Sequence, residues 1–392
     1  MSDTTLERTT ALRARTGVFL AFAIAGFAFA SWASRLPDVK RLLDLGPGEL
    51  GTLLLAMAAG SMIGLPLSGR IISALGTRRT ITVGMWSTAL GLMVGSLGAD
   101  VFHNFALIWA ANFLSGLSIG VWDVAMNHEG AEVERRLGRA IMPWFHAAFS
   151  GATVVSALFG SLLTGLGVAI WVHLWVVAAV VLGVGLYGVS LFLPPSPQAA
   201  DEAVGKQPSA WLEPRTLVIG LVVLAAAFAE GTANDWVAVA MVDGHGLPAW
   251  LGVLGLAAFL GFMTVGRIAG TYALDRFGRV PVLQALFVLA IAGSLLMVFG
   301  DPVWAFVGAA LWGLGASLGF PVGMSAAADD PAHAAARLSV VSTIGYMAFL
   351  AGPPLLGALG DKVGILYALL AVTAFMVPAL LASPAVREPA NR

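Results

Sequence analysis

Ionisable side chains inside apolar stretches are the residues of this sequence that could do chemistry. Asp123 and His146 lie in two successive apolar stretches between Asn112 and Thr164, with a highly charged turn between them. Ionisable groups within a membrane-spanning helix cost roughly 2.5–3.5 kcal/mol each on insertion scales, so they are usually retained for function. A carboxyl group there can take up a proton on one side of a membrane and release it on the other. The pattern predicts a proton-linked solute site.

Helical spacing places polar and small residues on one side of the helix around Asp123. The members of this stripe are Asn112, Gly116, Gly120, Asp123, Asn127 and Glu134. Such a stripe is not typical of a surface that faces lipid. We therefore predict Asp123 as a proton carrier and Asn112 and Asn127 as solute ligands. The alternative is that Asp123 pairs with a buried partner purely for structure.

A similar stripe begins at His146 and continues through Ser150, Thr153 and Thr164. Because a short turn joins the two helices, His146 is expected to approach Asp123 or Asn127 and to take part in proton coupling. The alternative is a histidine that only satisfies packing.

The second half of the chain carries its polar cluster between Phe228 and Trp236. Glu230 lies about fifteen residues from the expected start of its helix, which is roughly 22 Å along the axis. Asn234 follows one turn later on the same face. We predict Glu230 as a proton carrier, and Asn234 and Asp235 as solute ligands. The alternatives place Asp235 near the outer surface or Glu230 in a static pair with Arg35.

Aromatic residues near the expected outer ends of helices offer further solute contacts. Trp32 and Trp236 are placed where a stacking platform over a sugar ring would be useful, although tryptophan at that depth is also an ordinary interface residue. Arg35, near the end of the first apolar stretch, and Tyr346 complete the predicted solute ligands. Three further tryptophans near helix ends suit interface anchors, namely Trp171, Trp250 and Trp304.

Composition decides which elements must position these residues. With 58% hydrophobic and only 11% charged residues among 392, a water-soluble domain would have too little polar surface. The net charge of −1 argues against a nucleic-acid partner, which would need a basic face. The chain has no cysteine, which excludes disulfides and thiolate metal sites, and its histidines show no metal-ligand spacing. We expect a polytopic membrane protein that is not an enzyme and has no cofactor or metal.

Twelve apolar stretches are long enough for the roughly 20-residue span of a bilayer helix. They fall in two sets of six, at about 17–32, 49–71, 80–99, 104–130, 139–165 and 169–193, and at about 215–241, 249–273, 280–300, 303–328, 337–360 and 364–383. The predicted fold is an all-α membrane protein of two six-helix bundles, 17–193 and 215–383. The proline-rich segment 194–214 is the predicted linker, and 1–16 and 384–392 are the predicted tails. A cleavable signal peptide is the alternative for the first stretch.

Basic residues set the expected orientation. With the N-terminus inside, the inner segments collect Arg78, Arg79, Arg135, Arg136, Arg139, Lys206, Arg215, Arg276, Arg279 and Arg337, whereas the outer ones hold Arg35, Lys40, Arg41 and Lys362. The positive-inside rule predicts that both termini are cytoplasmic. We expect a monomer in a bacterial plasma membrane, with a small solute, protons and lipid as its partners.

The two halves repeat each other. The pattern Gly69-x-x-x-Ser73-x-x-Gly76-x-Arg78-Arg79 is answered by Thr271-x-x-x-Asp275-Arg276-x-Gly278-Arg279. Duplicated halves are typical of alternating-access transporters, whose solute site lies at the midplane between them. We predict a gate made of Ser73, Arg78, Arg79, Asp275, Arg276 and Arg279. In it, Asp275 is expected to cap the eleventh helix near Arg337.

These two loops resemble the G-x-x-x-D-R-x-G-R-R signature of the major facilitator superfamily, and the resemblance covers about 17–383. The segment from Trp122 to Asn127 also looks like the fourth helix of fucose-permease-like sugar symporters, in which an acid is followed four positions later by Asn. That branch also carries an acid in the first helix, which this sequence lacks there. The resemblance implies proton-coupled symport of a sugar-like solute.

Two other functions remain open. Proton-driven efflux of an amphipathic compound is one, although Gly151 is followed by Ala152 and not by the proline typical of drug antiporters. A transporter-like sensor or assembly protein is the other. The sequence carries no P-loop, so a proton gradient is the expected energy source.

Overall fold

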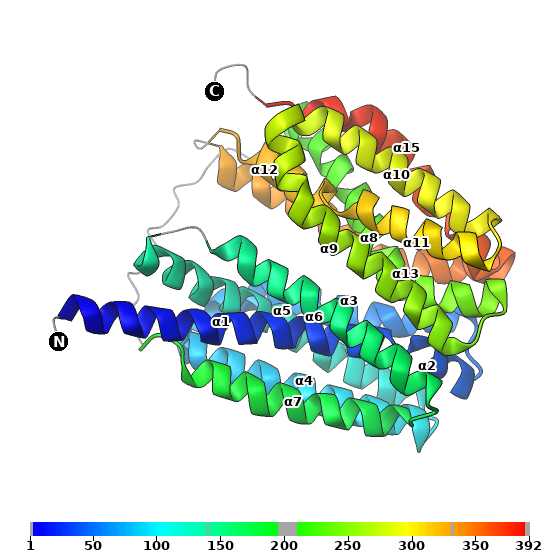
Figure 1. The fold of residues 1–392 in the computed structure, drawn as a ribbon, viewed down its shortest axis with the longest axis horizontal. Helices are drawn as coiled ribbons and strands as arrows, with labels where there is room; N and C mark the ends of the chain where they lie inside the picture. Colours follow the sequence, from blue (N-terminus) through cyan, green and yellow to red (C-terminus); the bar gives the residue numbers. More distant parts are fainter. Residues whose placement is uncertain (1–2, 139–140, 195–209, 331–332, 389–392) are drawn as a thin grey trace. The chain divides into compact units, whose positions relative to one another are not determined.

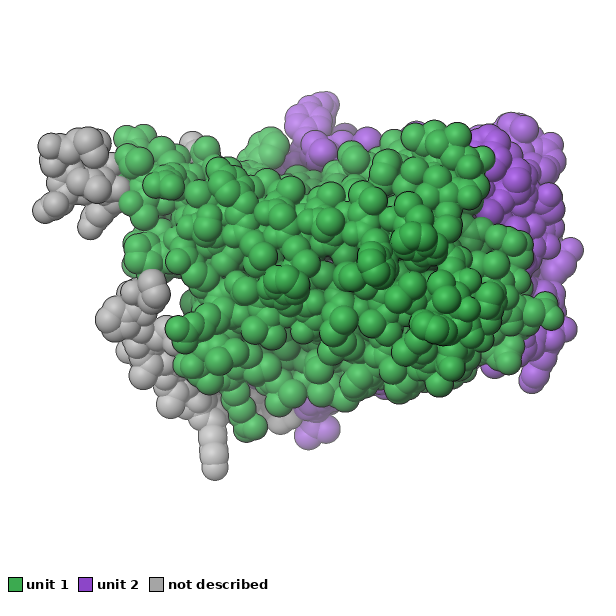
Figure 2. All heavy atoms as spheres, turned by 90° about the horizontal axis from the view of Figure 1, so that it is seen from below, with its two compact units in different colours: residues 1–196 green, residues 197–392 purple. Residues whose placement is uncertain are grey.

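The computed structural model describes residues 3–138, 141–194, 210–330 and 333–388. The chain forms two compact units, 1–196 and 197–392, which are coloured separately in Figure 2 and along the sequence in Figure 1. Helices are the regular elements of the described residues, and twelve candidate spans are long and apolar enough to cross a membrane. The predicted all-α fold with twelve spans is confirmed.

Unit 1 consists of seven helices that provide six spans. They are α1 (Asp3–Ala33), α2 (Leu36–Leu42), α3 (Pro47–Leu75), α4 (Thr77–Asp100), α5 (Phe105–Leu137), α6 (Met142–Gly165) and α7 (Ile170–Ser190). The expected start of the first helix at residue 17 is wrong, because α1 begins at Asp3 and its span begins at Arg8. The predicted N-terminal tail is therefore largely an extension of the first helix.

Helices α3 and α5 approach closely through glycine. A Cβ atom added at Gly116 would collide with the carbonyl of Met57, and one added at Gly60 would collide with the carbonyl of Phe113. In the same interface, Asn112 Nδ2 donates to the carbonyl of Leu53 at 3.3 Å. Small residues let helix backbones approach each other closely. This matters in a membrane, where the hydrophobic effect does not drive helices to associate.

Unit 2 consists of η1 (Ala210–Leu212), α8 (Pro214–His245), α9 (Ala249–Phe277), α10 (Arg279–Phe299), α11 (Pro302–Ala316), α12 (Gly319–Ala327), α13 (Ala334–Val363), α14 (Ile365–Ala368), α15 (Leu370–Ala382) and η2 (Ser383–Val386). Residues 195–209 of the predicted linker lie outside the described residues, as do Arg139 and Lys206.

The stretch expected as one helix over 303–328 is broken into α11 and α12 at Ser317 and Leu318. Pro321 has no backbone N–H, so the carbonyl of Ser317, four residues earlier, cannot receive its usual helical hydrogen bond. The break therefore leaves the carbonyl of Ser317 without a helical donor, although Ser317 is fully buried inside the unit.

Candidate functional site

A polar window interrupts the buried surface of α8 in unit 2. Residues 225–229 and 236–241 are all buried, whereas Glu230, Gly231, Asn234 and Asp235 between them are partly exposed. These four positions lie within one face of a helix. The predicted carrier Glu230 and the predicted ligands Asn234 and Asp235 are therefore brought together at a partly open level between two buried segments of this helix.

Glu230 pairs with an arginine that the sequence reasoning overlooked. Arg267 Nη2 on α9 donates to Glu230 Oε1 at 2.9 Å, and the two side chains keep 31% and 19% of their surface exposed. The alternative pairing of Glu230 with Arg35 is wrong, because Arg35 is buried inside unit 1, where it bonds His173 and Asp38. An arginine within the apolar stretch 249–273 was the signal that could have revealed the pair.

The broken tenth span supplies the second partner of Arg267. Its Nε lies 3.5 Å from the carbonyl oxygen of Ser317, the group that Pro321 leaves without a helical donor. The guanidinium thus links α8, α9 and the break between α11 and α12. In transporters, unwound backbone carbonyls beside half-helix ends are typical of solute and ion sites.

Unpaired polar atoms accompany the window. Within the described residues, Asn234 Oδ1 and the hydroxyl of the buried Thr232 are enclosed without a hydrogen-bond partner. An unsatisfied buried polar atom costs about 1–3 kcal/mol. A hydroxyl or amide of a ligand would remove that cost at Asn234.

In unit 1, the stripe on α5 serves two purposes. Its outer part, Asn112, Gly116 and Gly120, packs against α3, and Asn112 is only 3% exposed. The prediction of Asn112 as a solute ligand is therefore not supported, since its amide already bonds the neighbouring helix. Asp123 and Asn127 are partly exposed, and Asn127 Nδ2 donates to the carbonyl and to Oδ1 of Asp123 at 2.9 and 3.4 Å.

His146 is exposed on α6 and lies edge-on to Phe22 of α1, with ring centroids 5.0 Å apart. The ring contact therefore ties His146 to α1, and its expected approach to Asp123 or Asn127 stays a prediction.

The structure departs most from the prediction at three expected solute ligands, Arg35, Trp32 and Trp236. Arg35 is 1% exposed, with Nε donating to His173 Nδ1 at 2.9 Å and Nη1 to Asp38 at 3.1 Å. It thereby joins the α1–α2 junction to α7 inside unit 1. Trp32 and Trp236 are 4% and 0% exposed, so neither offers an open ring face. The two tryptophans, expected near the outer ends of their helices, are therefore buried by packing within the protein.

Tyr346 lies partly exposed on α13, between the rings of Phe320 and Phe349 at 6.3 and 6.4 Å. It therefore forms part of an aromatic group that spans α12 and α13.

The basic end of unit 2 is the end where α8, α10 and α13 begin and α12 finishes. The side chain of Asp329 is 3% exposed, and its carboxylate accepts hydrogen bonds from Arg279 Nη1 at 2.9 and 3.0 Å and from Arg215 Nη2 at 3.3 Å. Arg279 also donates its backbone N–H to Glu388 Oε1 at 2.9 Å, which fixes the C-terminal segment. Arg215 Nη2 reaches the carbonyl of Arg387 at 3.1 Å.

The expected role of Asp275 at this end is wrong. Asp275 is exposed on α9, and His333 occupies the position before the first residue of α13. Arg276 donates to the hydroxyl of Tyr272 at 3.0 Å instead of to a carboxylate. Asp329, which the sequence reasoning missed, takes the place of the acid because the chain folds it between two arginines.

At the corresponding end of unit 1, Arg78 and Glu129 both bond to backbone groups near the end of α7. Arg78 Nη2 donates to the carbonyls of Ser190 and Phe192 at 3.0 and 3.4 Å. Glu129, also missed, is 7% exposed and accepts the N–H of Leu193 at 2.8 Å. Glu129 lies eight residues before the end of α5 in the fourth span, and Asp329 lies two residues after α12 in the tenth. The remaining predicted gate residues, Ser73 and Arg79, are both exposed, and Ser73 Oγ donates to the carbonyl of Gly69 at 2.9 Å.

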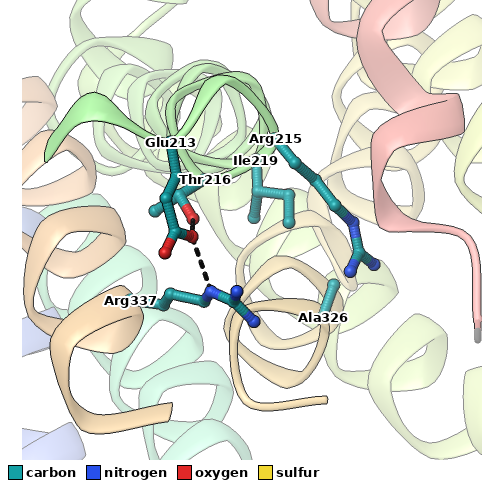
Figure 3. A pocket seen from close by; sticks show the side chains of 6 residues that line it. All are labelled: Glu213, Arg215, Thr216, Ile219, Ala326 and Arg337. Atoms are coloured by element: carbon teal, nitrogen blue, oxygen red, sulfur yellow. Dashed lines mark hydrogen bonds and ion pairs between the residues drawn. The ribbon is translucent and has the colours of Figure 1, made fainter. Parts of the chain in front are cut away.

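A small cavity of about 30 Å³ lies at the basic end of unit 2, and Figure 3 shows Glu213, Thr216 and Arg337 pointing toward one another there. Arg337 Nε donates to Glu213 Oε2 at 2.7 Å and Thr216 Oγ1 donates to the same oxygen at 2.8 Å. These hydrogen bonds, that of Arg337 above all, hold the pKa of the Glu213 carboxyl below its usual value.

Glu213→Gln is expected to lower the thermal midpoint slightly near neutral pH, by about 1 °C, because water reaches both side chains, which are 37% and 22% exposed at Glu213 and Arg337. A carboxyl with a depressed folded-state pKa stabilises the fold above its ordinary pKa of about 4.3, and this contribution is lost as the pH falls further. Thermal scans in detergent across this range measure it. A difference between mutant and wild type that persists unchanged at about pH 3 would contradict it.

No group of three or more His, Asp or Glu side chains in the described part of the chain is arranged to hold a metal ion. The spanning helices instead carry carboxyl groups, an arginine and amides at partly open levels. Such groups can bind protons and hydrogen-bond a polar solute.

Comparison with known proteins places the chain in a family. The profile of the Major Facilitator Superfamily matches residues 18–273 and 256–391. The chain is 31% identical over 369 residues to an uncharacterized transporter, y4wD, of Sinorhizobium fredii, covering 91% of this chain and 96% of that protein. It is also 30% identical over 378 residues to the membrane protein MosC of Rhizobium meliloti, covering 94% and 89%.

Solved structures share the fold. The nucleoside transporter NupG superposes with a TM-score of 0.74 at 14% identity, covering 96% of this chain and 98% of that one. A variant of the E. coli fucose:proton symporter FucP gives 0.63 at 17% identity, with 96% and 98% covered. Twelve spans, matching profiles over both halves and these relatives agree, and the chain is a transporter of the major facilitator superfamily.

Proposed function

We propose that this transporter carries a small hydroxylated solute into the cell together with protons, by alternating access between its two units. The observation that carries the proposal is the set of carboxyl groups at partly open levels of spanning helices, Asp123 on α5 and Glu230 and Asp235 on α8. Charged groups within spans are costly, and those that remain accessible mark solute and proton pathways.

The solute class is supported by hydrogen-bonding capacity. Asn127 lies beside Asp123, and the unsatisfied Oδ1 of Asn234 lies one turn from Glu230. Amide and carboxyl groups suit the hydroxyls of a sugar-like molecule. The structural relative FucP is a fucose:proton symporter, which is consistent with this choice. The protein would act in a bacterial plasma membrane as a monomer with both termini in the cytoplasm.

Uptake into proteoliposomes with an imposed pH gradient tests the proposal. With the outside about one pH unit more acidic, one-proton symport is expected to accumulate solute about tenfold. Radiolabelled sugars and sugar acids are the import probes, and vesicles without protein or with a protonophore are the controls. No accumulation of any of these solutes would overturn symport.

The same vesicles address efflux of an amphipathic compound. Accumulation of a cationic dye against a reversed pH gradient, with no uptake of sugars or sugar acids, would replace import by efflux. The abundance of aromatic residues, 9% of the chain, is the feature that favours this second function.

A further inference from the structure

We infer that Arg267 is the binding site for a carboxylate of the solute, and that Glu230 is the internal counter-ion which the solute displaces. The inference rests on the proposed function and narrows its solute to a small hydroxylated acid, such as a sugar acid. Glu230 becomes protonated when the solute carboxylate takes its place on the guanidinium.

The contacts of Arg267 show why it can exchange partners. Its Nη2 meets Glu230 Oε1 at 2.9 Å, and its Nε meets the carbonyl of Ser317 at 3.5 Å. Arg267 keeps 31% of its side chain exposed and Glu230 keeps 19%, although both lie far from the ends of their helices. The pair is therefore open to a ligand on one side and is anchored to the broken span on the other.

Stability alone gives a weak reason for such a pair. Removing two charges from water costs about as much as their attraction returns, and apolar replacements are often neutral or stabilising. A planar guanidinium, by contrast, matches a carboxylate through two parallel N–H donors. The guanidinium is well suited to receive a second carboxylate in place of the first.

Within the described part of unit 2, the helices around Glu230 carry few other charges. On the helices that pack against α8, the charged residue at this level is Arg267 of α9, and α8 itself adds Asp235. Helix α13 contributes Tyr346 at its middle, and the described part of α15 carries no charged residue. The other charged groups of these helices occur at their ends, as at the basic end of unit 2.

Charge balance fixes how protons follow the solute. Before solute binds, Glu230 supplies one carboxylate and Arg267 one guanidinium, so this pair is neutral, and Asp235 takes no part in the exchange. When Glu230 takes one proton and the solute brings one carboxylate, the sum is again neutral, and no covalent bond changes. Keeping the charge of the pair unchanged in both states avoids the cost of an uncompensated charge inside a span. One proton, taken up at Glu230 by the pathway that includes Asp123, moves with one carboxylate, so transport is electroneutral.

The hydroxyl part of the solute has a partner in the same window. Asn234 lies one helical turn beyond Glu230, and its Oδ1 is enclosed without a hydrogen-bond partner in the described residues. A solute hydroxyl can donate to it. The site thus selects for a carboxylate and a hydroxyl on one small molecule.

The test compares matched acids and neutral sugars in proteoliposomes of the full chain. The probes are gluconate and galacturonate against glucose and galactose, under a pH gradient with and without a potassium diffusion potential set by valinomycin. We expect at least one of the two acids to accumulate, to a level that the membrane potential does not change. The neutral sugars are expected to stay at equilibrium.

Variants of the pair give a second readout. Arg267→Gln is expected to weaken gluconate or galacturonate binding about tenfold to a hundredfold, the usual loss for a charge-assisted hydrogen bond. Glu230→Gln is expected to bind the same acid with an affinity that no longer varies with pH, because position 230 stays neutral. Arg41→Gln, an exposed arginine with 68% of its side chain accessible, is the matched control. The double variant Glu230→Gln with Arg267→Gln keeps the site neutral and checks that the fold survives.

Each opposing result has a distinct meaning. Accumulation of a neutral sugar that rises with membrane potential would overturn the carboxylate site and leave proton symport intact. Unchanged acid binding in a folded Arg267→Gln variant would also overturn it. Absence of accumulation for every probe would overturn the proposed symport and this inference with it.

Discussion

Asp123→Asn is expected to abolish uphill accumulation while leaving exchange of solute across the membrane within about threefold of wild type. Asparagine keeps the shape and the hydrogen bond to Asn127 but cannot bind and release a proton. The free energy of one proton moving across about one pH unit is worth a tenfold solute gradient. Without the carboxyl group that gradient falls to equilibration.

Two assays on one batch of vesicles measure the effect. Net uptake under a pH gradient should lose its overshoot, and counterflow with solute on both sides should persist. Asp301→Asn is a suitable control. Asp301 is the N-cap of α11 and accepts the N–H groups of Val303 and Trp304 in its first turn, and asparagine caps a helix equally well. Undiminished accumulation by the Asp123 variant would remove this residue from proton coupling.

Asp329→Asn is expected to destabilise unit 2 by about 3 kcal/mol, the usual result of removing one partner from a buried ion pair. Asp329 is 3% exposed at its side chain and Arg279 is 10% exposed, so the guanidinium would be left enclosed without its main counter-ion. Glu388 offsets part of this loss, since its Oε1 lies 3.8 Å from Arg279 Nε.

The neighbouring carboxylate provides the comparison. Asp330 meets His333 at 2.6 Å and Arg337 at 3.6 Å, but 44% of its side chain is exposed. Exposed pairs contribute about 0–1 kcal/mol, so Asp330→Asn should change little. In detergent we expect the thermal midpoint of the Asp329 variant to fall by about 10 °C. Equal midpoints for the two variants would show that the buried arginines have other compensation.

The general architecture was readable from the sequence because bilayer physics leaves few choices. Backbone groups in hydrocarbon must bond within their own segment, so each apolar stretch of sufficient length becomes a helix. The first helix was misjudged at its start, since polar residues beyond a membrane can continue a helix without an apolar signal. The break at Ser317 was missed, although Pro321 provides its physical cause.

The candidate site was predictable only in part. Glu230, Asn234 and Asp235 were singled out because polar and charged groups inside a span are unusual, and their role stays a prediction. The same rule applied to Arg267 would have identified the partner of Glu230. Trp32, Trp236 and Arg35 were misplaced because side-chain type does not tell which side of a helix meets a neighbour. Their burial follows from packing against helices far away in the sequence.

By itself the sequence determined that this chain crosses a membrane twelve times, repeats in two halves and carries ionisable groups within its spans. The reason is that hydropathy and spacing are properties of single segments. Only the tertiary structure decided which charges meet. Arg267 pairs with Glu230, and Asp329, not Asp275, pairs with the arginine Arg279. Asn112 bonds the backbone of a neighbouring helix. Those outcomes depend on which faces of separate helices come together, and no single segment contains that information.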